Sequence, residues 1–150
     1  MADEFELQGL DRAIDLLKAL PNNARKKVVM MAARKATRVI TNAAKANSAG
    51  IDDPSTGRKI ALNIQQRFAS KTYRATGDVM FRVGVATPKG PIPKGNADEG
   101  AKGPTGHWHL LELGTEDMKA EPFMLPALTA NVGNATDTFA NEFQQGLKDL

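Results

Sequence analysis

Residues 107–128 constrain the fold of this chain more than any other stretch, because they hold its only tryptophan, both of its histidines and two closely spaced prolines. Trp108 and three leucines place four large apolar side chains within six residues, and Gly114 follows directly. A glycine here can adopt the positive φ that ends a helix or strand. The prolines bracket Phe123 and Leu125, and proline is tolerated in the first turn of a helix. The stretch predicts a short apolar element, a polar bend and the entry to a C-terminal helix, with Phe123 and Leu125 packed beneath it.

Three polar side chains in this stretch need separate explanations. Glu112 lies among the apolar residues, and because an unpaired buried carboxylate is costly, we expect it either to reach solvent or to have a partner. His107 and His109 stand two residues apart, so on a strand both imidazoles would face one side and could bind a metal. Further ligands at a suitable spacing are missing from the sequence. The prediction is therefore two ordinary surface or interface histidines and no metal site.

The sequence contains no complete catalytic constellation. It has no cysteine, which excludes thiol nucleophiles and disulfides. It has no Gly-x-Ser-x-Gly elbow, and the Lys-Gly pairs at 89–90 and 94–95 lack the eight-residue frame of a phosphate-binding loop. We therefore predict a protein that is not an enzyme and needs no cofactor.

Length and composition indicate a single domain, over residues 1–150, with a thin core. Only 41% of the residues are hydrophobic and 5% are aromatic, so we expect the chain to complete its burial against partners. No apolar run approaches the roughly 18–20 residues of a membrane span. The acidic N-terminal residues lack the pattern of a signal peptide. The sequence thus predicts no membrane contact and a cytoplasmic location before assembly.

The net charge is only +3, but the charge is unevenly distributed along the chain. No aspartate or glutamate occurs between Leu16 and Ile51, where lysines and arginines are frequent. Such a helix face is either simply solvated, or it faces DNA or an acidic subunit, and the sequence leaves these interpretations open. The residues assigned to this basic surface are Arg25, Lys26, Lys27, Arg34, Lys35, Arg38 and Lys45.

Periodicity and turn residues predict an α+β fold. A long helix is expected over 24–49 and a C-terminal helix over 125–150, from apolar residues at helical spacing. Alternation over 79–85 predicts a strand, which a turn at 76–78 joins to a second strand over 65–74 as an antiparallel hairpin. We expect an antiparallel sheet of about three to five strands, packed by the long N-terminal helix and the C-terminal helix. Shorter elements are expected as a strand over 5–10, a helix over 11–20 and a helical turn over 60–64.

Three motifs occur in an order that resembles one protein family. Residues 111–115 read Leu-Glu-Leu-Gly-Thr, and residues 120–127 read Ala-Glu-Pro-Phe-Met-Leu-Pro-Ala. Upstream, Pro-Ser-Thr-Gly at 54–57 precedes the apolar segment 60–64. With the preceding basic helix, this order resembles the tail-completion or minor tail component family of long-tailed phages of the lambdoid HK type.

The resemblance implies a structural virion protein of the phage neck, made in the host cytoplasm, that forms a ring at the top of the tail. It implies a ring of copies of itself, as a hexamer, and contacts with tail terminator, head-closure or adaptor, and tail tube proteins. It also implies non-specific contact of the basic helix with genomic DNA. Closed rings use heterologous interfaces, in which one patch meets a different patch on the next subunit. The residues assigned to the first patch are Trp108, Leu111, Glu112, Gly114, Thr115, Pro122, Phe123, Leu125 and Pro126.

Residues 87–106 are assigned to the second contact. They are rich in glycine and proline, and Ile92 is their only larger apolar residue, so the segment cannot bury enough surface to order itself. Loops of this length are usually functional or disordered. We predict a flexible loop that becomes ordered when it docks against a neighbouring ring.

A small basic nucleic-acid-binding module is the alternative function. It rests on the lysines and arginines of the helix over 24–49. Against it, the sequence shows no aromatic stacking platform and no recognised nucleic-acid-binding motif.

Overall fold

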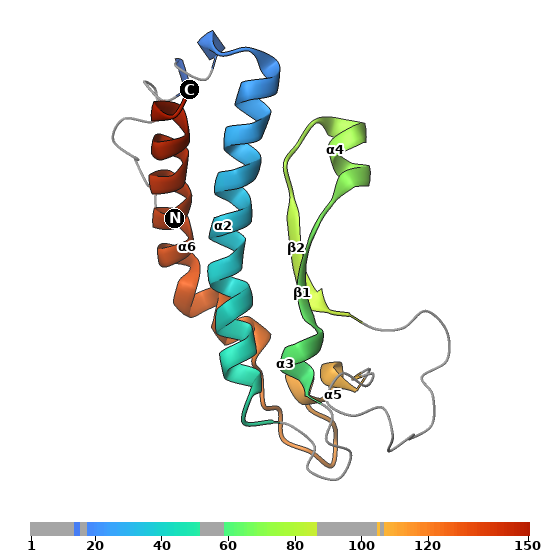
Figure 1. Ribbon diagram of the computed structural model, residues 1–150. Coiled ribbons are helices and arrows are strands. Elements are labelled where there is room, and N and C mark those ends of the chain that lie inside the picture. Colours follow the sequence, from blue (N-terminus) through green and yellow to red (C-terminus); the bar gives the residue numbers. More distant parts are fainter. Residues whose placement is uncertain (1–13, 16–17, 52–58, 87–104, 106) are drawn as a thin grey trace, which may run out of the picture.

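A computed structural model describes residues 14–15, 18–51, 59–86, 105 and 107–150 of the chain. Figure 1 shows two long antiparallel helices side by side, with a β-hairpin on the other side of the first helix. The fold is α+β: the long N-terminal helix and the C-terminal helix pack together, beside an antiparallel sheet of two strands. The elements in order are α2 (Asn22–Ser48), α3 (Ile60–Asn63), β1 (Ile64–Phe68), α4 (Ser70–Thr76), β2 (Phe81–Val85), α5 (Trp108–Leu113) and α6 (Met124–Lys148).

The two long helices confirm the predictions made from periodicity, with ends close to the predicted 24–49 and 125–150. At the N-terminal end of α2, Val28 and Ala32 form a buried cluster with Phe143 of α6. The Val28 side chain packs against the α6 backbone here, because a Cβ built on Gly146 would lie 2.9 Å from it. This contact fixes one end of the helix pair.

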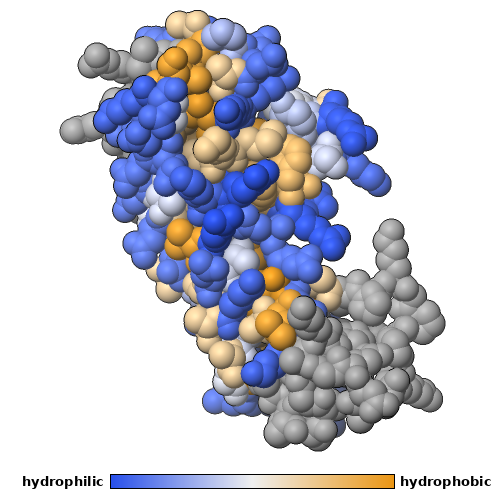
Figure 2. Space-filling view, in the orientation of Figure 1, coloured by the Kyte–Doolittle hydropathy of each residue, from blue (hydrophilic) through white to orange (hydrophobic). Residues whose placement is uncertain are grey.

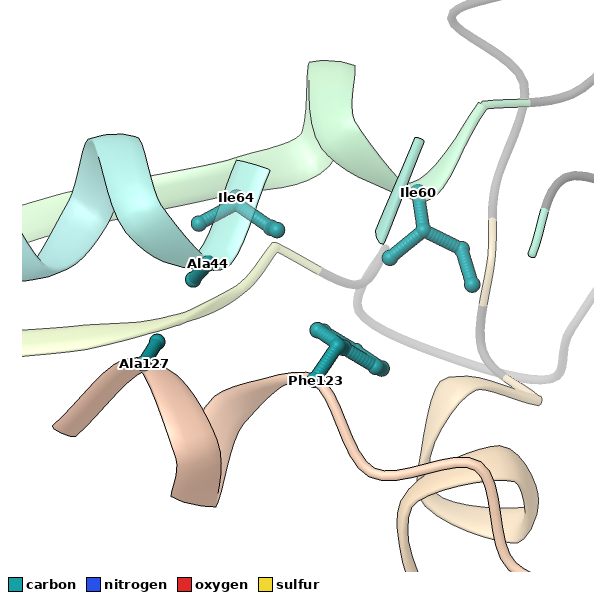
Figure 3. Close-up of a cluster of buried hydrophobic side chains, with 5 residues drawn as sticks. All are labelled: Ala44, Ile60, Ile64, Phe123 and Ala127. Carbon is teal, nitrogen blue, oxygen red and sulfur yellow. The ribbon is translucent and has the colours of Figure 1, made fainter. Parts of the chain in front are cut away.

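A second buried cluster lies at the other end of the helix pair and joins four elements (Figure 3). Ala44 of α2 and Ala127 of α6 are small enough to let the helices and the base of the hairpin converge. Ile60 of α3 and Ile64 of β1 enter from the hairpin side, and Phe123 enters from the residue before α6. The predicted helical turn over 60–64 is confirmed as α3, and its role is to deliver Ile60 to this cluster.

The predicted antiparallel hairpin is confirmed, but the sheet is smaller than expected. β1 and β2 pair from Ile64 with Val85 to Phe68 with Phe81, and the described residues contain no further strand. The strand predicted over 65–74 ends at Phe68, and the helix α4 follows it. Gly77, expected in a tight turn, instead ends α4 with a φ of 80°. The prediction of three to five strands is therefore corrected to two in the described part of the chain.

Several predictions fall on residues outside this description. The strand over 5–10 and the motif at 54–57 lie outside it, as does the loop over 87–106 apart from Thr105. Thr105 is buried, and its hydroxyl accepts a hydrogen bond of 3.0 Å from the Asn63 side chain. Of the helix predicted over 11–20, the described residues 14–15 and 18–19 are helical. No helix within the described ranges is long and apolar enough to cross a membrane.

Candidate functional site: an assembly surface

The short helix α5 and the bend that follows it form a locked unit. Gly114 ends α5 with a φ of 75°, as predicted. A Cβ built at this position would lie 2.8 Å from the backbone nitrogen of Ala120, so the bend closes on itself only around a glycine. The backbone N–H of Glu121 donates a hydrogen bond of 2.7 Å to the carbonyl of Leu111, which ties the far end of the bend to α5.

Glu112 has the partner that its position among apolar residues required. Its carboxylate accepts hydrogen bonds from the backbone N–H groups of Phe123, Met124 and Leu125, at 2.8, 3.0 and 2.9 Å. These groups belong to the first turn of α6, where backbone N–H groups have no partner within the helix. Phe123, the N-cap residue just before α6, offers no side-chain cap of its own. Glu112 therefore caps α6 from a different element.

The capping hydrogen bonds decide the ionisation of Glu112. Burial acts to raise the pKa of this carboxyl, but the hydrogen bonds from Met124, Phe123 and Leu125 outweigh it and hold the pKa below its ordinary value. Hydrogen bonds to the charged form favour that form, and the positive end of the helix dipole acts in the same direction. The cap is thus charged at neutral pH. It joins the motif at 111–115, which contains Glu112, to the motif at 120–127, which contains its three donors.

Phe123 belongs to the chain's own core. Its side chain is 0% exposed, and it lies edge-on to the ring of Trp108 at 6.4 Å between centroids. Trp108 and Leu111 are half-buried and pack against the same cluster. The side chain of Phe123 therefore cannot contact a second subunit unless this core opens, whereas Thr115, Pro122 and Leu125 remain exposed.

Leu125 corrects a prediction. It was expected to pack beneath α6 with Phe123, but it is 60% exposed. Residues two positions apart on an α-helix are separated by about 200° of rotation about its axis. Leu125 therefore points away from the side on which Ala127 is buried. Leu113 of α5 is 78% exposed, which makes it the most exposed of the large apolar side chains that the structure describes.

A line of apolar side chains continues from Leu125 along α6. Leu128 and Val132 follow at positions three and seven residues further on, so they share one side of the helix, and they are 47% and 54% exposed. The helical spacing in the sequence puts both on one apolar stripe with Ala135, Phe139, Phe143 and Leu147. Only Ala135 and Phe143 of that stripe are buried in the described structure. We call Leu125, Leu128 and Val132 the exposed stripe.

The exposed stripe leads into an uncharged groove of about 360 Å³ between α2, α6 and the start of β2. Apolar and hydroxyl-bearing side chains line it. Figure 2 shows several separate hydrophobic areas on one face of the molecule, with hydrophilic residues between them. Sequence reasoning missed the groove, because the width of the gap between two helices and a strand is set by the fold. Its main lining residues are Ala33, Ala36 and Ile40 of α2, Phe81 of β2, and Val132 and Phe139 of α6.

The basic residues of α2 divide into two groups. Arg25 donates to backbone carbonyls ahead of α2 at 2.9 and 3.2 Å, and Lys35 forms an ion pair of 2.6 Å with Glu142 of α6. Lys26 and Arg34 lie over the rings of Tyr73 and Phe81. These four therefore have contacts within the fold. The described part of the chain offers no hydrogen bond or ion pair to the side chains of the others, Lys27, Arg38 and Lys45.

The histidines do not share a side of a strand. His107 precedes α5 and His109 lies within it, in a helical backbone. Within the ranges that the structure describes, no group of three or more histidine, aspartate or glutamate side chains is arranged to hold a metal ion. His109 is exposed beside the ring of Trp108.

Comparisons with protein-family models, with curated proteins and with solved structures find no match to this chain.

Proposed function

We propose that this chain is a structural virion protein of a tailed phage. In this role it forms a ring at the top of the tail, completes the tail and helps to join it to the DNA-filled head. Its partners are further copies of itself in a sixfold ring, the tail terminator, the head-closure or adaptor protein and the tail tube protein. The resemblance of 111–115 and 120–127 to the tail-completion family supports the class of protein.

The exposed stripe beside the uncharged groove is the observation that carries an assembly role. Three large aliphatic side chains in one line on α6 leave apolar surface in water, and each Å² of that surface is worth about 25 cal/mol when it is covered. Contiguous apolar patches on small proteins mark interaction sites. The groove has no charged side chain in its lining, so a charged occupant would be buried there without a partner and is disfavoured. A surface of this kind serves docking between proteins.

The capped bend supports the same role. Glu112 fixes the first turn of α6, and Gly114 fixes the bend, so Leu113 and Leu125 are held in place on the surface before any partner arrives. Pre-organisation of this kind lowers the entropy cost of association.

A phage that lacks this protein tests the proposal. Electron microscopy of the lysate is expected to show filled heads and separate tails that fail to join. The wild-type chain supplied in trans should restore joined particles, and Leu128→Asp should not, because it places a charge in the exposed stripe. Ala130→Asp is the matched control, since Ala130 is exposed on the opposite side of the same helix. Normal joining without the protein would contradict the proposal.

A nucleic-acid-binding module remains the second candidate, and one observation favours it. Lys27, Arg38 and Lys45 lie eleven and seven residues apart, which places them on one side of α2, and the described residues leave them without ion-pair partners. Duplex DNA in a salt titration separates the two functions. Tight binding that falls steeply with salt, and that Lys27→Glu with Lys45→Glu abolishes, would favour this candidate. Weak binding with a shallow slope would favour the assembly role.

A further inference from the structure

The outward side of the hairpin is a basic groove. Alternation along the strands sends Ile64, Gln66 and Phe68 towards α2 and leaves the residues between them on the other side. Figure 1 shows α4 at the tip of the hairpin and α2 along one side of it. The groove has a volume of about 740 Å³ and contains no carboxylate in its lining. Its polar lining residues are Gln65, Arg67, Ser70, Lys71, Thr72 and Arg82.

Two arginines of this groove stand directly opposite each other. Arg67 of β1 pairs in register with Arg82 of β2, and like charges in this position destabilise a sheet. Arg67 donates one hydrogen bond, to Gln65 at 3.3 Å, and the only ion pair among the described residues joins Lys35 to Glu142 on the helices. The groove therefore carries three cationic side chains, Arg67, Lys71 and Arg82, and the described residues supply no carboxylate in its lining.

The bend between α5 and α6 carries the opposite charge. Glu116, Asp117 and Glu121 are all exposed there, and with Lys119 in the same bend their net charge is −2. The bend is rigid, because the Thr115 N–H donates to the carbonyl of Met118 at 2.9 Å and the Met118 N–H donates to the Thr115 hydroxyl at 3.1 Å. Within the described residues none of the three carboxylates has an ion-pair partner.

We propose that the acidic bend of one copy docks in the basic groove of the next copy. This inference rests on the proposed ring, and it names the pair of patches through which neighbours meet. A ring requires two different complementary patches on each subunit, and these two occur on the same chain with opposite charge. A rigid bend loses little conformational entropy on docking, whereas a flexible acidic segment would lose much more.

Charge reversal on each side tests the contact in the full-length chain. The groove-reversed variant carries Arg67→Glu and Arg82→Glu, and the bend-reversed variant carries Glu116→Lys and Asp117→Lys. Sedimentation velocity at low salt should show that each associates about tenfold or more weakly than the wild type. An equimolar mixture should regain association, because each acidic groove then meets a basic bend and each basic groove meets an acidic bend. A single chain with all four substitutions should also regain it.

Two controls keep the test specific. Circular dichroism spectra and melting temperatures show that each variant is folded. Lys18→Glu with Lys148→Glu matches the charge change of the groove-reversed variant at two exposed lysines outside the groove and outside the basic surface of α2. The inference is overturned if either reversed variant associates like the wild type, if mixing restores nothing, or if the groove instead binds duplex DNA. Joined phage particles assembled from the groove-reversed variant alone would overturn this contact and leave the proposed ring standing. Joining without any copy of the protein would remove the ring itself.

Discussion

Glu112 shows how one carboxylate organises the candidate site. It serves three backbone N–H groups of α6, which no other described side chain reaches. We expect Glu112→Gln to lower the free energy of unfolding by about 1–2 kcal/mol, since the charge and one acceptor oxygen are lost. Urea denaturation measures the change. Glu116→Gln removes an exposed carboxylate four residues away and should have almost no effect, so equal losses in the two variants would contradict the capping role.

The lowered pKa of Glu112 predicts a pH dependence with a definite sign. Because the folded-state pKa lies below the unfolded-state pKa, the charged cap stabilises the fold at all pH values above the unfolded value. That contribution is lost as the pH falls through the lowered folded-state pKa. The difference in unfolding free energy between the wild type and Glu112→Gln should therefore be constant near neutral pH and shrink once the pH falls below about 4.3, the ordinary value for an unfolded glutamate. A difference that grows on acidification would contradict the assignment.

Gly77 and Gly114 both have a positive φ, but Gly114, with a ψ of 175°, adopts a backbone conformation that is essentially restricted to glycine and is also crowded. At Gly77 a Cβ would meet nothing within 4 Å, so Gly77→Ala should cost only the left-handed backbone, about 1–2 kcal/mol. At Gly114 the backbone of Ala120 lies within 2.8 Å of the new Cβ, and backbone atoms cannot move aside cheaply. Thermal unfolding should show a clearly larger loss for Gly114→Ala. Similar losses at both positions would show that the bend can open.

At the residue level, the sequence predicted the existence of these features better than their partners. The position of Glu112 among leucines required a partner, and Gly114 was expected to adopt a positive φ, and both expectations are confirmed. The identity of the partner could not be predicted, because the first turn of α6 is eleven residues away along the chain and approaches only after the bend closes. The exposure of Leu125 depends on which side of α6 meets α2, which periodicity alone leaves open.

Among the elements, α6 contains two glycines that look alike in the sequence and differ in the fold. Gly133 has open space around it, so Gly133→Ala should raise the stability by about 0.5–1 kcal/mol through helix propensity. Gly146 lies against Val28, which is buried and stiff at χ1, so Gly146→Ala should lower the stability by about 1–3 kcal/mol through overpacking. Urea denaturation distinguishes the signs.

A double variant identifies the cause at Gly146. With Val28→Ala in place, the clashing methyl groups are gone, and Gly146→Ala should then be neutral or stabilising. An unchanged penalty in that background would mean that the helix spacing is not set by this contact.

The long elements were predictable and the short ones were less so. α2 and α6 are long enough for a helical period to be clear, and the alternation before Val85 identified β2. The alternation around Tyr73 predicts a strand where the structure has α4, because seven residues are too few for periodicity to distinguish a strand from two turns of helix. The helix α4 packs back on the hairpin, where the centroid of the Tyr73 ring lies 5.5 Å from that of the Phe68 ring.

For the whole molecule, the two clusters predict unequal stability. The helix pair is held at both ends, whereas the hairpin is held mainly at its base, where Ile60 and Ile64 are buried. A two-stranded hairpin is marginally stable without such support. The sequence predicted the thin core that produces this difference, but the location of the clusters along α2 follows from the crossing of elements that are distant in the chain.

Hydrogen exchange on the free protein can detect this gradient with two matched amides. The Ala86 N–H donates to the Asn63 carbonyl at 2.8 Å beside the buried base of the hairpin, and the Ala69 N–H donates to the Met80 carbonyl at 2.9 Å near its tip. The bonds are alike in length, so their protection should differ through local opening alone. We expect Ala69 to exchange at least about tenfold faster than Ala86, and the buried Ala44 of α2 to be slowest. If Ala69 were as protected as Ala44, the hairpin and the helices would open as one unit, and the hairpin would already be rigid in the free subunit.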